Sequence, residues 1–294
     1  MSGGRAWLLA ARPHTLWAAA GPVLVGAGLA LGDGVFRPDV FLATLVGALA
    51  IQVAANLAND ASDARRGADS AGRIGPTRAV ASGLLSERAV WMATWASFGV
   101  AALAGLYLAA VAGWLVLAVG VAAIVATLAY TGGPWPYGYH ALGELFVFVF
   151  FGLVATVMSR YVYDRSAPAE AWLLAVPVGL LVTSILVVNN IRDIETDAVA
   201  GKRTLAVVLG REAAGGLFAA LVAAAFAAIA LFAVTGWAPP PTALALAAAP
   251  LAVPLIRRVR RYTAGPLLVE ALKGTARLHA LVAALLSAGA AWPS

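Results

Sequence analysis

Two short stretches rich in Asp and Asn are the parts of this 294-residue chain whose residue types could carry chemistry. They span residues 56–69 and 189–197, and together they hold six of the fourteen acidic residues. Carboxylate and amide oxygens without Cys or His suit Mg²⁺, which usually also binds water and substrate phosphates. The pattern therefore predicts Mg²⁺ sites that clamp a diphosphate. The predicted metal ligands are Asn59, Asp60, Asp63, Asp193 and Asp197.

The two stretches are copies of one pattern. Asn56 aligns with Asn190, Asn59 with Asp193, Asp63 with Asp197 and Gly67 with Gly201. At 100° per residue, the aligned positions of each copy fall on one helical face. Like charges gathered at the end of an apolar helix are costly unless a cation lies between them. We therefore expect the two copies to face one another across a cation-binding site.

Basic and polar residues near the two stretches could bind the rest of a diphosphate, because its oxygens gain negative charge as the leaving-group bond breaks. Taken singly, each cation is better explained by the excess of Lys and Arg in cytoplasmic loops of membrane proteins than by a role in catalysis. The candidate substrate-binding residues are Arg12, Asn56, Asn59, Arg65, Arg73, Arg78, Asn189, Asn190, Lys202 and Arg203.

The elements that position these residues must be membrane helices. The chain is 62% hydrophobic and 12% charged, about half the charge of an average globular protein. A bilayer core of about 30 Å needs roughly 20 apolar residues in a helix. The sequence predicts an all-α integral membrane protein with nine transmembrane helices. Their approximate ranges are 15–31, 40–58, 89–110, 113–130, 142–162, 171–191, 214–235, 241–256 and 275–292.

This helix count predicts the organisation and orientation of a single transmembrane domain covering residues 1–294. Four helices separate the two acidic copies, so the repeats, about 12–130 and about 142–256, run parallel. The ninth helix, about 275–292, is additional. Nine spans leave only Arg37, Arg160 and Arg165 of the twenty cations on the side opposite the N-terminus. The positive-inside rule therefore places the N-terminus and the active-site mouth in the cytoplasm, with the chain in the cell's inner or plasma membrane. Cations divided among separate short loops argue against a nucleic-acid partner.

Several motifs give the chain a family resemblance. Besides the acidic stretches, they are Arg-Pro-His-Thr-Leu at 12–16, Arg-Ile-Gly-Pro-Thr-Arg at 73–78, Tyr-Thr-Gly-Gly-Pro-Trp-Pro-Tyr-Gly-Tyr at 130–139 and Gly-Lys-Arg-Thr-Leu at 201–205. Over essentially its whole length the chain resembles the UbiA superfamily of intramembrane prenyltransferases. Within the superfamily it is most similar to the menaquinone-pathway members, which prenylate 1,4-dihydroxy-2-naphthoate. One departure is Gly67, where many members carry a third Asp; Asp69 could substitute.

The resemblance implies transfer of a polyprenyl chain from polyprenyl diphosphate to 1,4-dihydroxy-2-naphthoate, with loss of the ring carboxylate as CO₂. Mg²⁺ on the predicted ligands would stabilise the departing diphosphate, and Arg12 or Arg78 could bind the acceptor carboxylate. Aromatic faces would stabilise the allylic cation, and the candidates are Tyr130, Tyr137 and Tyr139. The catalytic set is then Asp60, Asp63, Asp193, Asp197 and Tyr139.

Other functions share part of this pattern. A related enzyme could use 4-hydroxybenzoate, homogentisate or haem as the acceptor, with every diphosphate-binding residue unchanged. A secondary transporter would place its carboxylates near the membrane midplane, whereas both stretches here lie at helix ends. A CDP-alcohol phosphotransferase would carry an Asp-Gly-x-x-Ala-Arg motif, which the sequence lacks. The sequence leaves the isoprenyl chain length and the oligomeric state open.

Overall fold

The structure is a computed structural model that describes residues 3–67, 78–263 and 265–292. Of the residues that the structure describes, 84% are helical. A π-helix, Phe148–Val154, joins α6 to α7, and 3-10 helices at Pro13–Thr15 and Pro240–Ala248 precede α2 and α11. The α-helices are α1 Gly3–Ala11, α2 Trp17–Gly32, α3 Pro38–Arg65, α4 Glu87–Ala112, α5 Leu115–Thr131, α6 Gly143–Val147, α7 Ala155–Asp164, α8 Ala169–Arg192, α9 Ile194–Val199, α10 Leu205–Thr235, α11 Ala249–Arg261 and α12 Gly265–Ala290.

Helices cover all nine segments in which the sequence predicted spans. By length and composition, six helical segments of the described residues are apolar enough to cross a membrane. A seventh is the pair of α1 with its 3-10 turn and α2, whose axes differ by 47°. The six segments are α3, α4, α6 to α7, α8, α10, and the 3-10 helix with α11. The protein is therefore an all-helical integral membrane protein.

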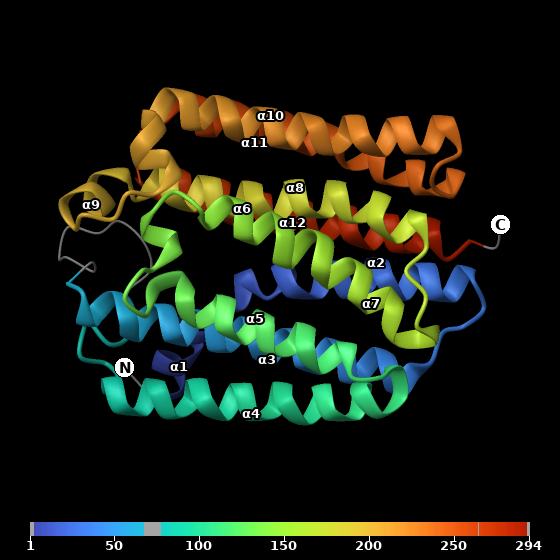
Figure 1. Ribbon diagram of the computed structural model, residues 1–294. Helices are drawn as coiled ribbons and strands as arrows, with labels where there is room; N and C mark the ends of the chain where they lie inside the picture. Colours follow the sequence, from blue (N-terminus) through green and yellow to red (C-terminus); the bar gives the residue numbers. More distant parts are fainter. Residues whose placement is uncertain (1–2, 68–77, 264, 293–294) are drawn as a thin grey trace.

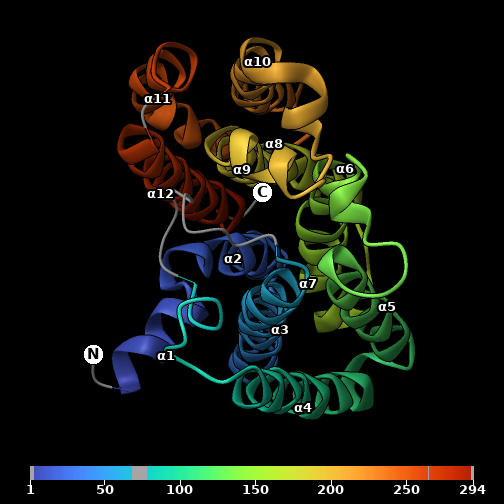
Figure 2. The same cartoon turned by 90° about the vertical axis from the view of Figure 1, so that its left-hand side faces the viewer.

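The long helices lie side by side, and the two acidic stretches are at the same end of the bundle. This end, on the left of Figure 1, holds the last turn of α3 and the short helix α9. Figure 2 looks on to it and shows α10 and α11 along one side of the bundle and α4 along the other. Stretches far apart in the sequence are thus brought to one end.

The helical face predicted for the acidic stretches holds only for the first copy. Residues 56–63 lie in the continuous helix α3, but the second copy breaks at Asp193, where the backbone leaves α8 and restarts as α9. Gly67 and Gly201 lie beyond the helix ends, with φ of +68° and +70°. Glycine adopts this left-handed conformation without strain and commonly stops a helix. The glycines of the repeat therefore end the acidic segments and do not lie on their polar face.

The core is centred on α8. Of its most apolar stretch, 72% is buried, against 28% in α3 and in α4. Leu174, Leu181 and Ile191 of α8 pack in one cluster with Phe218 of α10 and Leu268 of α12. α8 is therefore a fixed support for the second acidic stretch, which begins at its last turn.

Candidate active site

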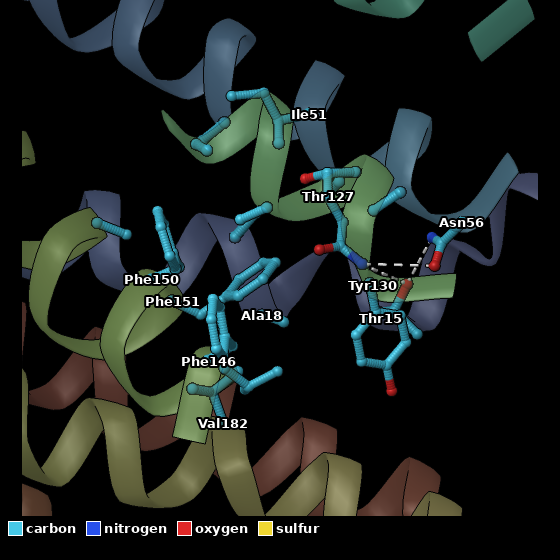
Figure 3. Close-up of a pocket in the computed structure, with 18 of the residues that line it drawn as sticks. Thr15, Ala18, Ile51, Asn56, Thr127, Tyr130, Phe146, Phe150, Phe151 and Val182 are labelled. Atoms are coloured by element: carbon cyan, nitrogen blue, oxygen red, sulfur yellow. Dashed lines mark hydrogen bonds between the residues drawn. The ribbon is translucent and has the colours of Figure 1, made fainter. Parts of the chain in front are cut away.

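A cavity of about 370 Å³ opens among α2, α3, α5, the α6 to α7 segment and α8. Its polar part includes Asn56, Asn59 and Asp63 of α3 together with Arg78 and Lys202. The remaining wall is mostly apolar. Figure 3 shows Phe146, Phe150 and Phe151 grouped on one side, with Thr15, Asn56 and Tyr130 on the other. A charged mouth joined to an apolar interior suits a ligand with an anionic head and a hydrocarbon tail.

Asp63 is the centre of the polar part. Its side chain is 3% exposed and lies 3.1 Å from Arg78 Nη2. The Tyr139 hydroxyl donates a hydrogen bond to Asp63 Oδ1 at 2.9 Å. Lys202 Nζ lies 3.8 Å from Asp63 Oδ2 and 3.9 Å from Asp197 Oδ1. One ammonium group thus lies between a carboxylate of each acidic stretch. The two stretches therefore come together at one place, and a metal ion between them stays a prediction.

Tyr139 joins the same cluster through its ring as well as its hydroxyl. The guanidinium of Arg66 lies 5.5 Å from the ring centroid and the ammonium of Lys202 lies 5.3 Å from it. Burial, and next the negative charge of Asp63, raise the pKa of Tyr139 well above its usual value. Tyr139 therefore stays protonated at neutral and moderately alkaline pH and donates its proton to Asp63.

Two of the predicted metal ligands, Asp60 and Asp193, make contacts that hold the structure around the cavity. Asp60 accepts hydrogen bonds from the backbone N–H groups of Ala79 at 3.0 Å and Val80 at 3.1 Å. These bonds hold the chain that carries Arg78. Asp193 pairs with Arg192 at 2.7 Å through Nε and 2.5 Å through Nη2. Of the five predicted ligands, Asn59 and Asp63 line the cavity, whereas Asp60, Asp193 and Asp197 do not; Asp197 reaches the site through Lys202.

The other predicted site residues also divide into those that line the cavity and those that lie outside it. Arg12, Tyr130, Tyr137 and Asn189 line the cavity with those named above, and the rings of Tyr130 and Tyr137 are 5.4 Å apart. Arg65 does not join these residues: its side chain is 73% exposed and pairs with Glu87 at 2.9 Å. Arg203 is exposed, and its backbone N–H donates to the Tyr139 carbonyl at 3.1 Å. Asn190 donates to Glu144 at 2.9 Å. Arg73 and Asp69 lie outside the described residues.

Sequence reasoning missed two residues of the cavity wall. Arg192 is one of the cations that the positive-inside rule alone would explain, yet its side chain is 2% exposed and donates to Asn189 as well as pairing with Asp193. Its position inside the second acidic stretch was a usable signal. Gln52 is the second, and its signal is its position one turn before Asn56 on the same helical face.

The donor set suits a hard cation, but no metal cage is preformed. Within the described ranges, no three His, Cys, Asp or Glu side chains are grouped closely enough to hold an ion by themselves. The carboxylates of Asp63 and Asp197 instead share Lys202. An arrangement of two carboxylates about one positive charge fits Mg²⁺ that arrives with a diphosphate and keeps waters and phosphate oxygens as its remaining ligands.

Comparison with known proteins identifies the family. The UbiA prenyltransferase family matches residues 19–268. A 1,4-dihydroxy-2-naphthoate octaprenyltransferase of Mycobacterium leprae is 41% identical over 97% of this chain and 95% of its own length. The enzyme of the same name from Escherichia coli is 37% identical over 92% of this chain and 91% of its own.

A solved structure agrees in fold. A UbiA homologue from Archaeoglobus fulgidus bound to DMAPP and Mg²⁺ superposes with a TM-score of 0.65, at 15% identity, over 96% of this chain and 99% of that one. The family match and the long relatives lead to one conclusion: this chain belongs to the UbiA prenyltransferase family.

Proposed function

We propose that the protein transfers a polyprenyl chain from polyprenyl diphosphate to 1,4-dihydroxy-2-naphthoate, giving demethylmenaquinol, diphosphate and CO₂. The observation that carries this proposal is the Lys202 ammonium between Asp63 and Asp197 at the mouth of a largely apolar cavity. The acceptor is supported by the names of the relatives, which act on 1,4-dihydroxy-2-naphthoate and match almost the full chain.

We propose that Mg²⁺ is held mainly by Asp63, Asp197 and Asn59. All three offer oxygen ligands, and Asn59 lies one turn before Asp63 on α3. The ion would supply positive charge to the departing diphosphate. Asp60 and Asp193 would support this metal site indirectly. Asp60 binds the backbone N–H groups beside Arg78, and Asp193 pairs with Arg192.

Cations of the chain complete the diphosphate site. Arg78, Lys202 and Arg192 line the cavity and are each less than a tenth exposed. As the carbon–oxygen bond of the prenyl diphosphate breaks, its electron pair stays on the diphosphate oxygen, which these donors stabilise. The new carbon–carbon bond forms to the naphthalene ring, and the ring carboxylate leaves as CO₂ with its bonding pair returned to the ring.

The aromatic wall fits the cationic stage of this reaction. Tyr137 stacks on Phe146 with ring centroids 4.0 Å apart, and Phe146 stacks on Phe150 at 6.1 Å. Aromatic faces stabilise a carbocation without acting as nucleophiles, and an apolar wall keeps water from capturing it. Tyr130 lies against Tyr137 and continues this wall toward the polar mouth.

A direct assay tests the proposal. Purified protein would be incubated with Mg²⁺, a polyprenyl diphosphate and one acceptor at a time: 1,4-dihydroxy-2-naphthoate, 4-hydroxybenzoate or homogentisate. We expect CO₂ and a prenylated product with the naphthoate alone. Turnover confined to 4-hydroxybenzoate or homogentisate would move the protein to a sister activity of the family, and absence of prenyl transfer to any acceptor would refute the proposal.

We also propose nine spans arranged as two parallel repeats plus one helix, with the N-terminus and the cavity mouth cytoplasmic. Helices at all nine predicted segments and both acidic stretches at one bundle end support this topology. Because the chain has no cysteine, single cysteines report sidedness cleanly. An impermeant maleimide should label Ala198→Cys only in inverted vesicles and Ser166→Cys only in intact cells. The reverse pattern would invert the topology.

A further inference from the structure

Gln52 on α3 is a buried side chain in the cavity wall with an unused hydrogen-bond acceptor. The residue is 7% exposed, and Oε1 has no hydrogen-bond partner anywhere in the described parts of the chain. Its amide nitrogen Nε2 lies 3.3 Å from Thr15 Oγ1 and 3.5 Å from Asn56 Oδ1. A buried carbonyl oxygen without a donor costs about 1–3 kcal/mol, so its retention in a cavity wall points to a ligand.

The surrounding hydrogen bonds determine which atom of the Gln52 amide, the nitrogen or the oxygen, has no partner. Asn56 Nδ2 donates to the Ala11 carbonyl at 2.8 Å and to Thr15 Oγ1 at 2.9 Å, as the dashed lines in Figure 3 show for Thr15. Because a backbone carbonyl only accepts, Asn56 must present its nitrogen there and its Oδ1 toward Gln52. The Thr15 hydroxyl donates its hydrogen bond to the Arg12 carbonyl oxygen at 2.9 Å.

Both neighbours of Gln52 are therefore acceptors on the side that faces it. Gln52 must point its NH₂ group at Thr15 and Asn56, and its Oε1 is excluded from that network. A rotation of the amide by 180° would set Oε1 against two acceptor oxygens and would be repulsive. The network thus presets an acceptor oxygen for a donor supplied from outside the chain.

The location separates the two substrates of the proposed function. Gln52 lies about two helical turns from Asn59, on the side away from Asp63. Ala48 and Ile51 of the same helix and Ala18 of α2 line the same cavity, and all three are apolar. A polyprenyl tail carries no hydrogen-bond donor, so it could never satisfy Gln52 Oε1. A dihydroxynaphthoate carries two hydroxyl donors.

Building on the proposed function, we propose that Gln52 is a specificity-determining residue whose Oε1 accepts a hydrogen bond from a ring hydroxyl of the aromatic acceptor. Thr15 and Asn56 act as positioning residues for it. This arrangement selects a ring that bears a hydroxyl at the matching position, because a ring without that hydroxyl leaves the buried carbonyl unsatisfied. The loss of one such bond corresponds to about tenfold in affinity.

The test compares three acids as ligands of the full-length protein. KM is measured for 1,4-dihydroxy-2-naphthoate, and inhibition constants for 1-hydroxy-2-naphthoate and 4-hydroxy-2-naphthoate, each lacking one hydroxyl. The variants are Gln52→Met, which keeps the length but removes the acceptor, and Thr44→Val as the matched control. Thr44 lines the same cavity on the same helix, but its hydroxyl donates within the helix to Val40 at 2.8 Å.

We expect the unaltered protein and Thr44→Val to favour the dihydroxy acid about tenfold over one monohydroxy acid. Gln52→Met should lose that preference while its KM for polyprenyl diphosphate stays within about twofold. Equal binding of all three acids by the unaltered protein, or a preference that persists in Gln52→Met, would overturn the proposal. A rise in KM for polyprenyl diphosphate in place of the acceptor effect would also overturn it. Failure of the unaltered protein to prenylate the naphthoate would instead refute the proposed function.

Discussion

The two ends of the helical bundle both carry buried ion pairs, but they are built differently. At the end opposite the cavity mouth, Arg160 is 4% exposed and is held by Asp33 and by Asp164, each at 2.7 Å. At the mouth, Asp63 is shared by Tyr139, Arg78 and Lys202, and the ion-pair distances are 3.1 Å and 3.8 Å. The mouth also has one tight pair, Arg192 with Asp193 at 2.5 Å. What distinguishes the mouth is therefore Asp63, a carboxylate shared among several donors, whereas the opposite end has a cation saturated by two carboxylates.

This difference separates a structural clamp from a binding site. The Arg160 cluster joins α7 to the residue that follows α2, and Arg160 does not line the cavity. The Asp63 cluster borders the cavity, and its cations lie at distances from which an entering diphosphate with Mg²⁺ can draw them away. Burial of charge is common to both ends, so burial alone does not identify the site. Shared, loosely held partners beside a cavity do.

The largest expected effect comes from removing a carboxylate at the mouth. Asp63→Asn or Asp197→Asn should reduce prenyl transfer by about a thousandfold, equivalent to about 4 kcal/mol of transition-state stabilisation. Asp33→Asn, at the opposite end, is the matched control and should keep most of its turnover per folded molecule. The measurement is kcat with saturating substrates. Near-normal turnover in both mouth variants would contradict the metal assignment.

The opposite clamp should respond in stability and not in chemistry. Arg160→Gln leaves two partly exposed carboxylates without their cation, and we expect about 2 kcal/mol of destabilisation, given that solvent screens the partners. The readout is the thermal unfolding midpoint in detergent, with turnover measured on the folded fraction. A variant that unfolds normally but has lost transfer would place this end of the bundle in the chemistry.

Substitution of a basic residue at the mouth should affect the binding of polyprenyl diphosphate according to where that residue lies. Lys202→Met removes the group between Asp63 and Asp197 and should raise the KM for polyprenyl diphosphate about tenfold or more. Arg65→Met should change it by less than about twofold, because Arg65 pairs with Glu87 on the surface. Equal effects of the two substitutions would show that general positive charge, and not placement, binds the diphosphate.

Among the substitutions expected to impair transfer, the smallest effect is expected at Tyr139. Tyr139→Phe removes one hydrogen bond to Asp63 and should lower turnover about five- to tenfold. Since the raised pKa keeps the hydroxyl protonated well above pH 9, the alkaline limb of the activity profile should have the same midpoint in Tyr139→Phe and in the unaltered protein. A midpoint that moves in the variant would show that Tyr139 itself titrates in this range.

Sequence reasoning located the site better than it assigned individual ligands. Helical periodicity and the internal repeat placed Asp63 and Asp197 at facing helix ends, because like charges in an apolar setting demand a shared cation. Periodicity shows which residues share a helical face, but it does not show which later segment of the chain packs against that face. For this reason Asp60, which binds the backbone of Ala79 and Val80, was indistinguishable from Asp63. The break at Asp193 was equally invisible, since nothing local in the sequence forbids a continuous helix there.

Gln52 is a second case in which the sequence shows the residue but not its contacts. Its type and its spacing from Asn56 were visible in the sequence, but an unused acceptor is a property of the surrounding network and not of the residue. Only the contacts of Thr15 and Asn56 show that the oxygen of Gln52 is left over.

The most direct test of one shared site is a double-mutant cycle on ligand binding. Affinity for a polyprenyl diphosphate in the presence of Mg²⁺ would be measured by calorimetry for the unaltered protein, Asp63→Asn, Asp197→Asn and the double variant. If both carboxylates hold the same Mg²⁺–diphosphate group, each single variant loses most of the affinity and the double variant loses little more. Independent, additive losses, or unchanged affinity in either single variant, would contradict the shared site.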